Sequence, residues 1–217
     1  MKNESVRFYY DLLNNKRFSL IVKCLSDKIL AVLLLALLSP IFVIVAIAIK
    51  IDSKGPVMFR QIRVTQYGRC FRIYKFRTMV ESEDNNLLIT TSHDKRITRV
   101  GRILRKYRID EIPQLLNIIS GDMTFVGTRP EVVKYVDAYT DEMLATLLLP
   151  AGVTSEASIK YRDEEALLDN MSNTEAIYLN EVLPSKMKYN LESIAKFSLV
   201  RDLSTVLKTV AAVLRLT

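Results

Sequence analysis

The sequence is poor in the residues that bind zinc, because it has only two cysteines and one histidine; it also has no tryptophan. Cys24 and Cys70 form no CxxC pair, and His93 forms no HExxH motif. The spacings typical of zinc sites are therefore missing. Two unpatterned cysteines fit a reducing compartment, and we expect His93, which lies in a polar stretch, to be a surface residue.

The composition is that of a folded protein with one strongly basic part. The 217 residues, 49% hydrophobic and 25% charged, can build one large domain or two small ones. The formal charge is +7, and residues 50–111 alone hold 15 Lys or Arg against 7 Asp or Glu. A basic block of this kind suits phosphate, nucleic acid or anionic lipid, and a solvated charged surface is the alternative.

One long apolar run, "ILAVLLLALLSPIFVIVAIAI", covers residues 29–49 without a charge. As a helix it would be about 31 Å long, close to the thickness of one hydrocarbon core. It begins too far from the N-terminus for an ordinary signal peptide and has no small-residue cleavage site. The alternative is a buried core helix, which would need cover on all sides.

The apolar run is interrupted at Ser39-Pro40. Proline has no N–H and clashes with the preceding turn, and it pushes Ser39 away from helical angles. The Ser39 hydroxyl can bond to the backbone carbonyl that proline leaves without a donor. We therefore expect the helix to be broken at this step.

Both flanks of the run are basic, and the positive-inside rule places both in the cytoplasm. A straight span cannot satisfy both flanks, whereas a helix that enters and leaves by the same face can. We favour this re-entrant form, and a kinked single-pass helix remains the alternative. The basic flanking residues are Lys16, Arg17, Lys23 and Lys28 before the run, and Lys50, Lys54, Arg60 and Arg63 after it.

The part that follows the run mixes short strands with helices. Residues 55–79 begin with Gly-Pro and alternate in "CFRIYKF", which predicts short strands or a hairpin. "DEIPQLLNIIS" predicts a helix with Asp110 as N-cap and Gly121 as its stop. Asp110 is thus either a helix cap or a reactive group. An arginine recurs at every third position just before it, at residues 96, 99, 102, 105 and 108.

The C-terminal part is predicted to be helical and amphipathic. One face of this part is apolar, and it is either core or membrane surface; we expect core. The face comprises Ile194, Phe197, Val200 or Arg201, Leu203, Leu207, Val210 and Leu214.

Several motifs in this order resemble the bacterial sugar transferases, also called monotopic phosphoglycosyl transferases. They are the anchor interrupted at Ser-Pro, "GPVMFRQIR", "FRIYKFRTM", "RVGRILRKYRIDEIPQLLNIISGDMTFVGTRP" and "RDLSTVLKT". The likeness runs from about residue 16 to the end and is of the small type with only the catalytic domain and anchor. The stretch "PAGVTSEASIKYRDEEALL" departs from the form seen in many members, and we expect it to shape sugar specificity.

The resemblance implies transfer of a phospho-sugar from a UDP-sugar to a polyprenol phosphate, usually undecaprenyl phosphate, with release of UMP. It implies that Asp110-Glu111 is the catalytic pair and that Asp110 is the nucleophile that forms a covalent phospho-sugar. We expect Glu111 to assist the attack by the acceptor. The reaction of the family needs magnesium, which the resemblance places at Asp110. Lys75, Arg77, Arg105 and Arg129 match basic residues of the family that lie close to the phosphates.

The expected fold is therefore mostly α with a small β element (α+β). Residues 1–50 would form an amphipathic segment and a re-entrant membrane helix, and residues 51–217 a catalytic domain with amphipathic surface helices. We expect this domain on the cytoplasmic face of the bacterial inner membrane. The expected partners are the UDP-sugar, the polyprenol phosphate and the lipid bilayer, with a homo-oligomer left open.

Two other functions fit part of the sequence. A non-enzymatic membrane adaptor that binds anionic lipid explains the anchor and the charge, but not Asp110-Glu111 followed by a helix. A tethered nucleic-acid binder would need the aromatic and basic recognition motif of a standard module, and the sequence has none. We therefore expect no nucleic-acid partner.

Overall fold

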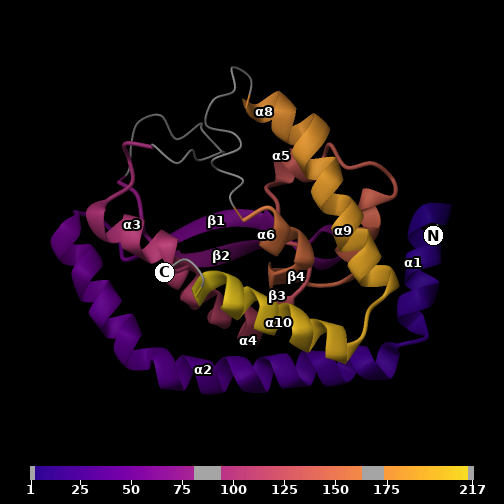
Figure 1. Cartoon of the computed structure of the whole chain (residues 1–217), viewed down its shortest axis with the longest axis horizontal. Coiled ribbons are helices and arrows are strands. Elements are labelled where there is room, and N and C mark those ends of the chain that lie inside the picture. Colours follow the sequence, from indigo (N-terminus) through magenta and orange to yellow (C-terminus); the bar gives the residue numbers. More distant parts are fainter. Residues whose placement is uncertain (1–2, 81–93, 163–173, 215–217) are drawn as a thin grey trace.

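The structure, a computed structural model, describes residues 3–80, 94–162 and 174–214, so His93 lies outside the described residues. It is mostly helical and has two small two-stranded sheets (Figure 1), which confirms the α+β prediction. The elements are α1 Glu4–Asn14, α2 Arg17–Asp52, β1 Met58–Val64, η1 Gln66–Gly68, β2 Cys70–Phe76, α3 Arg99–Lys106, η2 Ile109–Gln114, α4 Leu115–Ser120, β3 Met123–Val126, α5 Val133–Val136, η3 Met143–Leu148, β4 Ala151–Thr154, α6 Glu156–Lys160, α8 Thr174–Ile177, η4 Tyr178–Val182, α9 Leu183–Ala195 and α10 Leu199–Leu214.

Helix α2 carries the Ser-Pro step without ending there. It runs from Arg17 to Asp52 with Pro40 inside. The carbonyl of Ala36, which loses its N–H partner to proline, accepts a hydrogen bond from the Ser39 hydroxyl at 2.8 Å. The predicted break is therefore a bend in one continuous helix, because the serine restores the bond that proline removes; Figure 1 shows α2 bent around the rest of the molecule.

Both ends of α2 are fastened to the same domain. Near its start, the buried Lys23 pairs with Asp202 of α10 at 2.6 Å. At its end, Asp52 accepts a hydrogen bond from the backbone N–H of Val100 at 3.0 Å. A bilayer crossed by a straight helix would separate these two ends, so the contacts favour a helix that returns to the face it entered.

The two faces of α2 differ sharply in exposure. Ala31 is fully buried against Leu115 and Ile118 of α4. Only 11% of the most apolar 18-residue stretch is buried, so the alternative of a buried core helix is wrong. Among the described residues, α2 is the one helix long and apolar enough to cross a membrane. The outer face, which water would solvate poorly, includes Leu33, Leu37, Ile44, Ile47 and Ile51.

The hairpin of β1 and β2 confirms the predicted strands, and one asparagine joins it to the helices below. The side chain of Asn117 in α4 is fully buried. Its Oδ1 accepts from the N–H of Tyr74 at 3.0 Å, and its Nδ2 donates to the carbonyl of Arg72 at 2.9 Å. Asn117 thus takes the place of a neighbouring strand along β2 and fixes the hairpin against α4 and η2.

The apolar C-terminal face divides between two environments. Ile194 of α9 and Phe197 after it are buried, as expected. The core prediction is wrong for α10, because the five residues of the predicted apolar face that it carries are 51–78% exposed. Helix α10 packs through Thr205 and its neighbours and turns its other face outward, beside α2 (Figure 1). The exposed residues are Val200, Leu203, Leu207, Val210 and Leu214.

The contacts at both ends of α2 predict that residues before and after the apolar run label from the same side of the membrane. In a background with Cys24→Ser, the exposed Cys70 reports on the domain that follows α2. Asn15→Cys, in a background that lacks both native cysteines, reports on the exposed loop before α2. In intact bacterial cells neither cysteine should react with a membrane-impermeant maleimide, and both should react after permeabilisation. Labelling of Asn15→Cys alone in intact cells would show a spanning helix.

Candidate active site

The backbone of Arg108 sets the start of the short helix η2, which carries Asp110 and Glu111. Arg108 adopts a left-handed conformation with φ 56° and ψ 22°, which costs a non-glycine residue about 1 kcal/mol. It occupies the cap position of η2, so the prediction that Asp110 caps a helix is wrong, and Asp110 lies in the first turn. Gly121, with φ 84°, ends α4 as predicted.

The Glu111 carboxylate is the point at which three cationic side chains meet. Its Oε1 lies 2.7 Å from Arg129 Nη2, 2.9 Å from Lys75 Nζ and 3.7 Å from Arg108 Nη1. Burial by itself would raise the pKa of Glu111, but these three positive charges outweigh it and hold the pKa well below its usual range. The same carboxylate is the main cause that raises the pKa of Arg129. Glu111 is thus an ionised centre that fixes three cations from different elements.

Asp110 is buried to the same degree, but one of its oxygens has no partner. Its Oδ1 makes no hydrogen bond to any of the described residues. Burial raises the pKa of Asp110, Lys75 opposes that rise and Glu111 adds to it. Burial and the neighbouring Glu111 thus outweigh the positive charges around Asp110, and the net shift of its pKa is upward. An oxygen without a competing donor can attack an electrophile or bind a cation.

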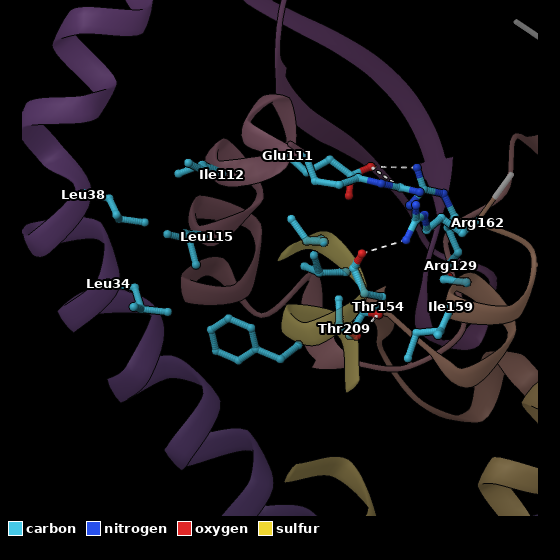
Figure 2. A pocket seen from close by; sticks show the side chains of 16 residues that line it. Leu34, Leu38, Glu111, Ile112, Leu115, Arg129, Thr154, Ile159, Arg162 and Thr209 are labelled. Carbon is cyan, nitrogen blue, oxygen red and sulfur yellow. Dashed lines mark hydrogen bonds and ion pairs between the residues drawn. The ribbon is translucent and has the colours of Figure 1, made fainter. Parts of the chain in front are cut away.

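A cavity of about 220 Å³ reaches from this charged centre to the long apolar helix α2. Leu34 and Leu38 of α2 line it on one side, and Glu111 and Arg129 on the other. Figure 2 shows the two leucines pointing from α2 toward the cavity, with the charged side chains gathered across from them. The site can therefore receive a molecule that has one anionic and one apolar part.

Comparison with known proteins decides the family. Residues 18–216 match the model of the bacterial sugar transferases. The chain belongs to this family. It is 38% identical over 196 residues to the UDP-glucose:undecaprenyl-phosphate glucose-1-phosphate transferase of Caulobacter vibrioides, covering 88% of this chain and 69% of the relative.

Two further relatives carry related names. The protein with the same name in Klebsiella pneumoniae is 34% identical over 197 residues, which cover 88% of this chain and 40% of that protein. The UDP-N-acetylgalactosamine-undecaprenyl-phosphate N-acetylgalactosaminephosphotransferase of Aeromonas hydrophila is 46% identical over 118 residues, 54% of this chain and 28% of the relative. The chain thus spans well under half of the length of both.

The structure brings three of the four predicted phosphate-binding residues close to Asp110 and Glu111, whereas the contacts of Arg77 are with the end of α2. Lys75 and Arg129 contact Glu111 directly. Burial raises the pKa of Asp110, and the positive charge of Arg105 is close enough to oppose that rise. Arg77 lies elsewhere: it is buried and donates to the carbonyl and hydroxyl of Ser53, at 2.7 and 2.9 Å, at the end of α2. Its contacts are those of a residue that holds the membrane helix to the domain.

Sequence reasoning missed two arginines that line the cavity, Arg108 and Arg162. Arg108 belongs to the series of arginines at every third position, but its left-handed backbone, which turns it toward Glu111, has no signal in the sequence. Arg162 lies in the stretch that departs from the family pattern, whose last residues, 163–168, fall outside the described part.

The residues present fit a magnesium ion that is shared with the substrate. Among the described residues no three His, Cys, Asp or Glu side chains gather to form a cage. Mg²⁺ in phosphoryl-transfer sites is commonly held by one or two carboxylates together with substrate phosphates. The unpartnered Asp110 Oδ1 offers one such oxygen.

We predict that Glu111→Gln destabilises the protein by about 2 kcal/mol, because it leaves three partly buried cations without their counter-charge. The midpoint of thermal unfolding in detergent should fall by about 4–8 °C. Added pyrophosphate should raise the midpoint of the variant more than that of the wild type, since an anion can replace the carboxylate.

The matched control is Glu192→Gln, which removes the carboxylate from an exposed pair with Lys196. Its midpoint should change by less than the equivalent of about 0.5 kcal/mol. Equal effects of the two substitutions would contradict a central role for Glu111 in holding the site together.

Proposed function

We propose that this protein transfers a phospho-sugar from a UDP-sugar to a polyprenol phosphate, giving a polyprenyl-diphospho-sugar and UMP. The observation that carries the proposal is the pair Asp110-Glu111. One carboxylate has a buried oxygen without a hydrogen-bond partner, and the other holds three cations at the end of a cavity that reaches α2. The names of the relatives support undecaprenyl phosphate as the acceptor.

In the first step, an Asp110 oxygen attacks the β-phosphorus of the UDP-sugar. A bond forms between the carboxylate and this phosphorus, while the bond to the bridging oxygen breaks and UMP leaves with the electron pair. Negative charge grows on the leaving phosphate, and Arg129, Lys75 and Arg108 are already fixed in position to stabilise it. A magnesium ion held by Asp110 and the substrate would supply further positive charge beside the diphosphate.

In the second step, an oxygen of the polyprenol phosphate attacks the same phosphorus. The new phosphoanhydride bond forms as the bond to Asp110 breaks, and the carboxylate is regenerated. No proton has to move if the acceptor arrives as a dianion. Because Glu111 is already engaged by three cations, we propose that it orients them rather than acting on the acceptor itself, which revises the role that the sequence suggested.

Features of α2 and its flanks support a location of the protein at the membrane. The basic flanks of the apolar run and the contacts at both ends of α2 support a catalytic domain on the cytoplasmic face of the bacterial inner membrane. The exposed apolar faces of α2 and α10 would enter the bilayer and hold the site near the depth of the acceptor's phosphate.

We predict that the wild-type protein releases UMP from UDP-glucose or UDP-N-acetylgalactosamine when undecaprenyl phosphate and Mg²⁺ are present. Asp110→Asn should lower the rate by about 10³-fold or more, since the nucleophile is lost. The control Asp137→Asn makes the same change on an exposed residue and should keep the full rate.

UMP release is measured with purified variants in detergent micelles, with each component omitted in turn. Turnover by Asp110→Asn close to that of the wild type would contradict the role of Asp110. Absence of UMP release across a panel of UDP-sugars would favour the membrane adaptor instead.

A further inference from the structure

The cavity beside Glu111 has a lining that the donor does not need. Away from its charged end most of its lining residues are apolar, among them Leu34 and Leu38 of α2 and Val213 of α10. The polar side chains of this part are the hydroxyls of Thr154, Ser158 and Thr209. A nucleotide requires hydrogen-bonding groups for its base and ribose, and these walls supply few. A hydrocarbon chain requires only apolar surface.

The charged end of the cavity holds a third arginine besides Arg108 and Arg129. Arg162 follows α6, and its Nη1 donates to the carbonyl of Ala212 at 2.7 Å. Figure 2 shows Arg162 next to Arg129, across the cavity from Leu34 and Leu38. An arginine at this place can form charge-assisted hydrogen bonds to a phosphate that sits at the charged end.

Helix α10 closes one side of the cavity through two polar contacts. The Thr209 hydroxyl lies 2.8 Å from the hydroxyl of Thr154 in β4, and Arg162 binds the carbonyl of Ala212 in the last turn. The opposite face of α10 is apolar and exposed, as is the outer face of α2. The cavity is therefore lined by two helices whose outer faces both suit lipid.

Resting on the proposed function, we propose that this cavity is the slot for the first isoprene units of the acceptor, and that Arg162 binds the acceptor's phosphate. The chain would lie between α2 and α10, with its remaining length in the bilayer. Its phosphate would lie at the end formed by Arg162 and Arg129, beside Glu111 and hence next to the phospho-sugar on Asp110. One apolar chain and one phosphate match the two halves of the lining.

The sharpest test compares two neighbouring alanines of α10. Ala212 lines the cavity, whereas Ala211 is exposed. Ala212→Phe should fill the slot and raise the KM for undecaprenyl phosphate, or slow the second step, by about tenfold or more. The single burst of UMP that the protein releases from UDP-glucose or UDP-N-acetylgalactosamine without acceptor should be unchanged. Ala211→Phe should leave both steps unchanged.

A second pair of variants tests Arg162 without filling the cavity. Arg162→Met should raise the KM for undecaprenyl phosphate by about tenfold to a hundredfold, because a charge-assisted contact is lost. The KM for the UDP-sugar should stay unchanged. Arg162→Lys should recover part of the loss, since lysine keeps the charge but cannot present two parallel donors.

The outcomes separate the two proposals. If Ala212→Phe slows the UMP burst as much as the second step, the cavity holds the donor and the slot is refuted. The slot is also refuted if Ala212→Phe behaves like Ala211→Phe and Arg162→Met keeps the wild-type KM for the acceptor. If the wild-type protein gives no UMP with any UDP-sugar, the proposed function itself fails.

Discussion

The site depends on one buried carboxylate, Glu111, that holds three cations drawn from separate parts of the chain. Lys75 comes from β2, Arg108 from the turn before η2, and Arg129 from the loop after β3. Without a shared anion, these cations would repel one another in a partly buried space. With it they form a fixed positive surface beside Asp110, whose own oxygen is left unpartnered. Glu111 and Asp110 therefore differ in their partners, because the three cations contact Glu111 and leave one oxygen of Asp110 without a hydrogen bond.

Helix α2 is connected to the charged site through a series of contacts. Ala31 packs on α4, whose Asn117 holds β2 in place, and β2 carries Lys75 to Glu111. The bend in α2 allows the helix to follow the domain from Lys23 to Asp52 while its outer face stays apolar and exposed. The same contacts therefore fix the position of α2 and the positions of the charged groups of the site relative to one another.

Local chemistry made some of these features predictable from the sequence. The interruption at Ser39-Pro40, the β-hairpin and the helix stop at Gly121 follow from the properties of the residues themselves, whereas a chemical role for Asp110 and Glu111 is expected from the resemblance to the family. The rest depended on tertiary contacts. Apolar periodicity in α10 could not distinguish core from lipid, since both require the same residues. The contact of Arg77 with Ser53 has no signal in the sequence. Arg108 reaches Glu111 only through a left-handed backbone conformation, which the sequence does not predict.

The central claim is that Asp110 carries the phospho-sugar, and mass spectrometry after incubation with a UDP-sugar and Mg²⁺ without acceptor tests it most directly. Trypsin should release residues 109–134 as one peptide, because the bond between Arg129 and Pro130 resists cleavage. We predict a phospho-sugar on Asp110 in this peptide that disappears when undecaprenyl phosphate is added. A protein that turns over while this peptide stays unmodified, or that carries the adduct on another residue, would contradict the account.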